Sequence, residues 1–345
     1  MRYSDAGVDI SLADQAKQSI RRLAGRTFSR RVLAPIGGFG SLFAFDQHRW
    51  REPVLVASAD GVGTKLKIAF AMNVHSTVGV DIVNHCVNDI LTQGAQPLFF
   101  LDYLAMGKID PRVIEQIIEG MSRAAKQAGC ALVGGETAEM PGFYPPGEYD
   151  LAGFIVGAVE RSRMLGPARV NQGDTLIALP STGLHTNGYS LARKLVFDLA
   201  RLKPDTYVAD VRNKIGAELL KPHRCYWPML KNILSRGWIS AMAHITGGGI
   251  TGNLPRVLPR TAQAAIELGS WPVLPIFRYL ARLGKIENEE LLRTFNLGVG
   301  MILIVPRKNV RKVEAELKRR REKFYLIGRV EPGRPRVVYS GRLPV

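Results

Sequence analysis

The sequence predicts an α/β protein of the α+β type, built from two domains with mixed sheets. Its 345 residues are about twice the length of a typical domain. Strand-like and helix-like segments alternate along both halves, which favours layered α/β domains. The turn Asn171–Asp174 precedes a fresh strand, Thr175–Ser181, and we therefore expect domains at residues 1–170 and 171–345.

The first half contains the clearest helix of the chain. Asp110 is a good N-cap, Pro111 suits the first turn, and Gly129 ends the segment. Apolar residues recur at helical spacing between them and predict a helix over Asp110–Gln127. The other expected elements are strands at Pro53–Ser58, Gln96–Met106, Cys130–Gly134 and Leu151–Glu160, and helices at Thr64–Met72 and Asp81–Gln93.

The second half repeats this mixture of elements. In the run Arg307–Lys323, Val310, Val313 and Leu317 recur at helical spacing, which predicts an amphipathic helix with a basic outer face. Further helices are expected near residues 188–200, 225–235 and 273–283, and strands near residues 264–268, 298–305, 324–330 and 336–340.

Composition limits the class of protein. Hydrophobic residues make up 46% and charged residues 22%, which excludes a disordered chain. The apolar runs are far shorter than the ~20 residues of a membrane helix, and the first residues do not form a signal-like segment. The cysteines Cys86, Cys130 and Cys225 form no metal or disulfide pattern, so we expect a reducing, cytoplasmic setting.

The net charge of +17 comes entirely from the second half. Residues 166–345 contain 30 basic and 13 acidic residues, whereas residues 1–165 contain 17 of each. A basic surface can attract nucleic acid, membranes or small anions, but it is more often simply solvated. The run Arg307–Lys323 contains no aromatic residue of the kind that single-stranded nucleic acid would stack on. We expect neither nucleic acid nor a membrane as partner, on the strength of the motifs of the chain and not of its charge.

The segment Ser58–Lys65 (SADGVGTK) is a first candidate site, at a junction between a strand and a helix. Glycines and free N–H groups at such a junction can accept a phosphate. Lys65 adds a positive charge, and Asp60 is placed to hold a metal ion. The alternative is an ordinary tight turn with a solvated lysine.

The acidic residues that follow have no basic neighbour in the sequence. Residues 76–107 contain Asp81, Asp89 and Asp102 but no Lys or Arg. An unpaired carboxylate in an apolar setting is costly unless a cation compensates it, which favours an Mg²⁺ site. The alternative is the exposed polar face of an ordinary helix. The polar stripe consists of Asp81, Asn84, His85, Asn88 and Thr92, and further carboxylates, Glu136 and Glu139, follow in Gly134–Pro141.

The second half offers two loops rich in glycine and hydroxyl groups, Ser181–Ser190 and His244–Gly249. Each precedes a helix, and such loops can cradle anions. His185 lies among Ser, Thr and Asn residues, which favours a functional role. We interpret the other isolated histidines, His48, His75 and His223, as structural, and the cysteines as core residues.

Taken together, these motifs resemble those of the phosphoribosylformylglycinamidine cyclo-ligase family, the aminoimidazole ribonucleotide (AIR) synthases. Each piece is shared loosely with relatives, but the set is specific and covers nearly the whole chain. The chain departs from the family at Asn84 and His85, which are usually apolar, and in Tyr144–Glu148 and residues 201–224. The matching segments are Tyr3–Ile10, Ile36–Phe43, Ser58–Lys65, Val87–Tyr103, Val133–Gly142, Ser181–Ser190, His244–Gly249 and Thr294–Met301.

The resemblance implies AIR-synthase-like N- and C-terminal domains and a ring closure that depends on ATP and Mg²⁺. ATP would phosphorylate the formyl oxygen of formylglycinamidine ribonucleotide, the amidine-side nitrogen would attack the activated carbon, and phosphate would leave. The resemblance also implies a cytoplasmic homodimer whose N-terminal domains are joined through their sheets.

The resemblance assigns the site residues by position. The expected metal ligands are Asp60, Asp81, Asp89 and Glu136, and ATP binding is expected at Asp60, Gly61, Gly63, Thr64, Lys65, Asn88 and Glu136. The substrate is expected at Ser181, His185, Thr186, Asn187, Gly247, Gly248 and Gly249. The expected catalytic residues are Lys65, Asp89 and His185.

Sister enzymes of the same fold are the alternatives, including the hydrogenase-maturation dehydratases. A selenophosphate synthetase would carry a reactive cysteine in the N-terminal glycine-rich loop, and Ile36–Phe43 has none. A thiamine-monophosphate kinase typically has a paired-Asp motif where this chain has Ala59, Asp60 and Gly61.

Overall fold

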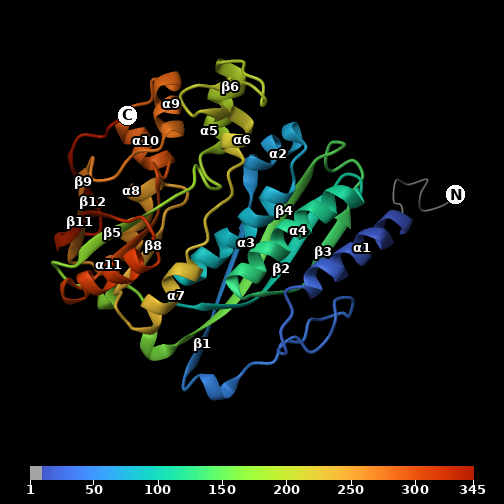
Figure 1. The fold of residues 1–345 in the computed structure, drawn as a ribbon, viewed down its shortest axis with the longest axis horizontal. Coiled ribbons are helices and arrows are strands. Elements are labelled where there is room, and N and C mark those ends of the chain that lie inside the picture. Colours follow the sequence, from blue (N-terminus) through green and yellow to red (C-terminus); the bar gives the residue numbers. More distant parts are fainter. Residues whose placement is uncertain (1–9) are drawn as a thin grey trace. The chain divides into compact units, whose positions relative to one another are not determined.

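The computed structural model describes residues 10–345, which fold as two units (Figure 1). The first unit comprises the chain up to Ile90 together with Ala95–Arg161, and the second comprises Leu91–Gly94 and Ser162–Val345. The chain thus passes into the second unit at residue 162, whereas the sequence was expected to divide at residue 171. Residues 3–9 of the motif Tyr3–Ile10 lie outside the described part of the chain.

The first unit is built on a four-stranded mixed sheet in the order β1-β4-β2-β3. The pairs β1–β4 and β4–β2 are antiparallel, and β2–β3 is parallel. The mixed sheet confirms the predicted fold class. The strands are β1 (Pro53–Gly61), β2 (Gln96–Met106), β3 (Ala131–Glu139) and β4 (Tyr149–Glu160).

Helices α3 and α4 pack against each other through glycines. A side chain on Gly79 of α3 would lie 2.0 Å from the Ile117 carbonyl oxygen, and one on Gly120 of α4 would lie 2.0 Å from that of Ser76. Helix α4 has the predicted termini, because Asp110 caps its N-terminus and Gly129 ends it in a left-handed conformation. The helices are α1 (Ile10–Gly25), α2 (Leu66–Met72), α3 (Ser76–Leu91) and α4 (Pro111–Ala128).

The second unit contains a six-stranded mixed sheet in the order β12-β9-β11-β5-β10-β8. Only the outer pair, β12–β9, is parallel. Its centre is strongly apolar, and every residue of β10 is buried. The strands are β5 (Thr175–Pro180), β8 (Ala241–His244), β9 (Ala262–Leu268), β10 (Val299–Val305), β11 (Tyr325–Pro332) and β12 (Val337–Gly341), with a separate hairpin of β6 (Tyr207–Val208) and β7 (Asn213–Lys214).

Short helices surround this sheet. Helix α11 is amphipathic as predicted, with Val313 and Leu317 buried beneath a basic outer face. The helices are α5 (Tyr189–Arg193, continued by a π-helix at Lys194–Leu199), α6 (Ile215–Leu219), α7 (Trp227–Ser235), α8 (Gly249–Asn253), α9 (Pro275–Gly284), α10 (Asn288–Thr294) and α11 (Val310–Arg319). Single 3₁₀ turns occur at Gln47–Arg49, Gly63–Lys65, Arg161–Arg163, Pro167–Arg169, Leu254–Val257 and Arg307–Asn309.

Two general expectations can be compared with the structure. The three cysteines are free and buried, as predicted for core residues. Within residues 10–345, none of the helices has the length and apolar character needed to cross a bilayer.

Candidate functional site

The first unit gathers polar side chains where the end of β1 faces α3. Side chains alternate along a strand, so Ser58 and Asp60 point to the same face of the sheet. Ser58 donates a hydrogen bond to Asp89 Oδ2 of α3 (3.1 Å), and His85 Nε2 lies 2.9 Å from Asp60 Oδ2. We call Ser58, Asp60, His85 and Asp89 the carboxylate cluster.

The two aspartates of the carboxylate cluster are accessible to solvent, but its histidine is not. The side chain of Asp60 is 42% exposed and that of Asp89 26%, whereas His85 is buried. The N–H of Gly61 donates to Asp60 Oδ1 at 2.7 Å. Although burial tends to raise the pKa of Asp60, the bond from His85 holds that pKa below its ordinary value. Burial alone would lower the pKa of His85, but Asp60 and Asp89 raise it. Both shifts favour a charge-assisted contact.

Lys65 and Asp81 form a buried ion pair instead of facing a ligand. Lys65 Nζ lies 2.8 Å from Asp81 Oδ2, and both side chains are completely buried. Burial lowers the pKa of Lys65, and Asp81 opposes that shift. The prediction that Asp81 lacks a basic partner is therefore wrong, as is the alternative of a solvated lysine. The partner was missed because the two residues meet only through the packing of α3 on the loop before α2. Neither side chain can reach a metal ion or a phosphate unless the pair opens.

The polar side chains along the stripe of α3 are buried in the interior of the protein. The alternative of an exposed polar face is wrong, because the stripe residues Asp81, Asn84, His85 and Asn88 are all buried. By contrast, Gly63 and Thr64, which precede α2, are exposed. The backbone of this loop therefore remains accessible, while the polar side chains beneath it are fixed by the interior.

A second acidic region of the first unit lines a pocket of about 290 Å³. Asp102 of β2 and Glu136 of β3 lie on its wall, and Lys17 and Arg21 of α1 also line it. Burial raises the pKa of Asp102 to about 7. The structure thus groups Asp102 with Glu136, and Asp60 with Asp89. Lys17 and Arg21 were not predicted, because no element was expected at α1.

In the second unit, His185 is held by its own loop. It adopts a left-handed backbone conformation (φ 63°), its ring is buried, and its Nε2 accepts the N–H of Thr182 at 3.2 Å. Asn296 fixes the loop from the neighbouring Thr294–Met301 motif. Its Oδ1 accepts the Ser181 hydroxyl (3.0 Å), and its Nδ2 donates to the Gly183 carbonyl (2.9 Å).

The two predicted anion loops of the second unit lie beside each other. A Cβ atom on Gly247 would lie 3.2 Å from Asn187 Oδ1, which is a tight contact. Glycine at this position therefore lets the two loops approach closely without displacing Asn187. Gly248 and Gly249 have φ values of +94° and +58°, in the left-handed region that favours glycine. Their loop is fixed from within, because Asn253 Nδ2 donates to the Gly249 carbonyl at 2.8 Å. The structure therefore brings Ser181–Ser190 and His244–Gly249 together.

His185 belongs to a cluster of three buried histidines with His223 and His244. One ring nitrogen of each lies within 4.8 Å of the other two. His223 Nε2 contacts His244 Nε2 at 3.0 Å, and the His223 ring stacks on His185 with centroids 4.0 Å apart and planes inclined by 23°. Since imidazole lone pairs lie in the ring plane, nearly parallel rings do not aim at one metal ion. His223 was interpreted as an isolated structural residue, and its place in this cluster was missed.

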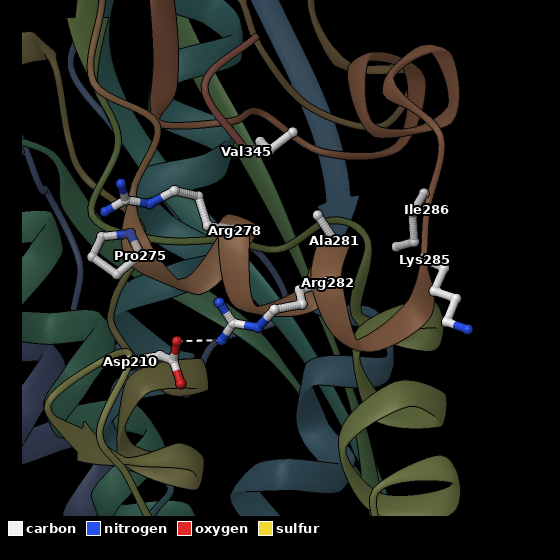
Figure 2. Close-up of a pocket in the computed structure, with 8 residues that line it drawn as sticks. All are labelled: Asp210, Pro275, Arg278, Ala281, Arg282, Lys285, Ile286 and Val345. Carbon is white, nitrogen blue, oxygen red and sulfur yellow. Dashed lines mark hydrogen bonds and ion pairs between the residues drawn. The ribbon is translucent and has the colours of Figure 1, made fainter.

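A basic pocket of about 530 Å³ lies beside α9 (Figure 2). Arg278, Arg282 and Lys285 line it, and Arg282 pairs with Asp210. In Figure 2 the side chains of Arg278 and Lys285 extend away from each other, so these charges do not converge on one point. None of the predicted site residues lines this pocket. Part of the excess positive charge of the second half therefore lies on the wall of this surface pocket.

Comparisons with known proteins agree with this architecture. Residues 48–159 match the AIR synthase related protein N-terminal domain, and residues 171–340 match the C-terminal domain. Among solved structures, a thiamine-monophosphate kinase from Stenotrophomonas maltophilia matches with a TM-score of 0.68 at 20% identity, covering 93% of this chain and 95% of that one. A hydrogenase maturation protein HypE in complex with ATP matches with a TM-score of 0.64 at 17% identity, covering 92% and 89%. At such identities these structures show the fold alone.

The sequence relatives are much closer. The chain is 49% identical to the phosphoribosylformylglycinamidine cyclo-ligase of Syntrophotalea carbinolica, over 98% of this chain and 97% of the relative. It is 47% identical to that of Brevibacillus brevis, over 98% of each. The chain therefore belongs to the AIR synthase related family and, within it, to the phosphoribosylformylglycinamidine cyclo-ligases.

Proposed function

We propose that this chain closes the imidazole ring of aminoimidazole ribonucleotide from formylglycinamidine ribonucleotide, using ATP and releasing ADP and phosphate. This reaction is a step of de novo purine biosynthesis, and the chain would work in the cytoplasm. The observation that carries the proposal is near-half identity to cyclo-ligases over almost the whole chain. A thiamine-monophosphate kinase is disfavoured, because likeness to such an enzyme is limited to the fold. A selenophosphate synthetase is disfavoured because Ile36–Phe43 contains no cysteine.

The carboxylate cluster is the proposed site for Mg²⁺ and the ATP phosphates. Its donors are the carboxylates of Asp60 and Asp89 with the hydroxyl of Ser58, and hard oxygen ligands of this kind suit Mg²⁺. A magnesium ion held there would neutralise charge on the ATP phosphates. The exposed residues Gly63 and Thr64 would contact phosphate oxygens through their backbone, whereas the N–H of Gly61 already donates to Asp60. Two other residues expected to bind ATP lie outside this cluster, because Asn88 is buried in α3 and Glu136 lines the separate pocket with Asp102.

The second unit would bind the ribonucleotide. The loops Ser181–Ser190 and His244–Gly249 combine hydroxyl, amide and glycine N–H groups without a carboxylate, as an anionic substrate requires. Because His185 Nε2 accepts a backbone N–H, the neutral ring carries its proton on Nδ1. Nδ1 is buried in this structure, so that N–H would donate to the formyl oxygen, and stabilise charge while phosphate is transferred, only after the loop Ser181–Ser190 opens toward the substrate. The remaining contacts are assigned to Ser181, Thr186, Asn187, Gly247, Gly248 and Gly249.

We also propose a homodimer formed through the sheet of the first unit. Leu55 and Phe154 lie on the opposite face from Ser58, because side chains alternate and Ser58 faces α3. They are 64% and 44% exposed, and exposed apolar sheet faces mark interaction sites. Sedimentation of a Leu55→Glu, Phe154→Glu variant should give a monomer where the wild type gives a dimer. A monomeric wild type would refute the proposal.

The function is tested by assaying aminoimidazole ribonucleotide formation with purified protein, formylglycinamidine ribonucleotide, ATP and Mg²⁺. The wild type should form the product, whereas Asp89→Asn should lose about 10²-fold or more in turnover because a charged group that positions phosphate is removed. Asp110→Asn is the matched control, since asparagine still caps α4. Without product from the wild type the function is refuted, and full turnover of Asp89→Asn refutes the site.

A further inference from the structure

The imidazole of His85 occupies the position between the two carboxylates of the carboxylate cluster. Its Nε2 lies 2.9 Å from Asp60 Oδ2 and 3.8 Å from Asp89 Oδ2. His85 belongs to α3 and its ring is buried, whereas the carboxylates of Asp60 and Asp89 are partly exposed to solvent. An apolar residue at position 85 would leave these two carboxylate oxygens without this nitrogen between them.

We propose that His85 is a positioning residue that competes with a divalent cation for Asp60 and Asp89 and thereby weakens cation binding at the carboxylate cluster. This inference rests on the metal site of the proposed function. It concerns how tightly that site binds its ion, a property that the family resemblance does not supply.

The competition follows from the oxygen atoms involved. The Nε2–H of His85 donates to Oδ2 of Asp60 in the charged ring and in the Nε2–H tautomer of the neutral ring. Mg²⁺ and Mn²⁺ bind carboxylate oxygens at short range and need several of them in a fixed geometry. A cation that uses Oδ2 of both aspartates must break or lengthen the bond to His85. The second oxygen of Asp60 is already engaged by the N–H of Gly61, at 2.7 Å.

The same geometry predicts the direction of the effect. Without the N–H donor, two carboxylates face each other with less compensation, and a cation then gains more by binding them. Removal of His85 should therefore tighten cation binding about tenfold, the equivalent of ~1.4 kcal/mol. If His85 were itself a metal ligand, its removal would weaken binding instead. The sign of the change thus separates the two roles.

The test measures Mn²⁺ binding to the full chain, using the electron paramagnetic resonance signal of free Mn²⁺ in place of an activity readout. We compare the wild type with His85→Leu, which removes the donor, and with His85→Gln, which keeps an N–H donor. His75→Leu is the matched control, because His75 is also buried in the first unit but bonds Tyr149 and Asn73. His85→Leu should bind Mn²⁺ about tenfold more tightly, His85→Gln should stay near the wild type, and His75→Leu should not change.

Thermal unfolding gives a second readout of the same competition. At the same concentration, Mn²⁺ should raise the melting temperature of His85→Leu more than that of the wild type, because the stabilisation of the folded state grows with the logarithm of the ligand concentration divided by Kd. Unchanged or weaker Mn²⁺ binding in His85→Leu, with binding abolished in Asp89→Asn, would overturn this inference and leave the metal site standing. Wild-type Mn²⁺ binding in Asp89→Asn would instead overturn the metal site. If His85→Leu does not fold, loss of Mn²⁺ binding in His85→Gln would overturn the inference.

Discussion

The two units hold the polar groups of their candidate sites by different interactions. The first unit fixes charges against one another: Lys65 against Asp81 inside, and His85 against Asp60 nearer the surface. The anion loops of the second unit contain no carboxylate, and they use glycine backbone, amides and imidazoles held by hydrogen bonds such as those of Asn296. The difference is one of ligand chemistry. The first arrangement suits a metal ion with its phosphates, and the second suits an anion without a metal.

The largest expected effect concerns the buried ion pair of the first unit. Lys65→Met should destabilise the fold by about 3–5 kcal/mol, because it leaves the Asp81 carboxylate buried without its cation. The free energy of unfolding from urea denaturation measures the change. The double variant Lys65→Met, Asp81→Leu removes both charges and should recover most of the loss. If the single variant loses less than ~1 kcal/mol in free energy of unfolding, the ion pair does not stabilise the first unit as a buried pair should.

The second unit should respond in turnover instead of stability. His185→Ala should lower turnover by about 10²–10³-fold, the range typical of removing one hydrogen-bond donor that stabilises developing charge, and by up to about 10⁴-fold if the imidazole also transfers a proton. Binding of a nonhydrolysable ATP analogue should be unchanged, since the nucleotide is assigned to the first unit. Titration calorimetry beside the product assay separates these two effects. Loss of analogue binding with turnover preserved at saturating ATP would reverse the assignment of the two units.

Local signals made much of this architecture predictable. Asp110 and Gly129 bound α4 as their chemistry requires, and an apolar, aromatic-rich run located β2 at Gln96–Met106. The short elements α6, α8, α10 and β8 were not predicted, since such brief segments show little periodicity. Helix α1 was overlooked, although Ala16, Ile20 and Leu23 recur at helical spacing. Pairings between distant segments were also missed, such as Lys65 with Asp81 and His223 with His185. The spacing of residues along the sequence does not predict which distant side chains come into contact when the helices and strands pack.

A pH experiment sharpens the contrast within the first unit. The folded pKa of Asp102 is about 7 against 3.8 unperturbed, so the folded state holds this proton more tightly than the unfolded state. Its contribution to stability is full below about pH 4 and is lost as the pH rises to about 7, over a total of a few kcal/mol. Asp102→Asn should therefore be more stable than the wild type at neutral pH and lose that advantage near pH 4. The same stability difference at both pH values would contradict a raised pKa.

The smallest effect is expected on the basic outer face of α11. Glu316 pairs with Arg319 and Arg320 there, and these bonds lower its pKa to about 2. Arg319 is exposed, so salt screens its pair, whereas Arg320 is half-buried and also donates to the Pro228 carbonyl. Neutralising Arg319, Arg320 and Arg321 together to Gln should leave turnover within about twofold of the wild type, because surface charge steers encounter without positioning substrate. The salt dependence of kcat/KM should become shallower, as fewer positive charges attract the anionic substrates. Measuring turnover at low and physiological salt checks both points. A collapse of activity with an intact fold would mean that α11, and not only the two anion loops, belongs to the substrate site of the second unit.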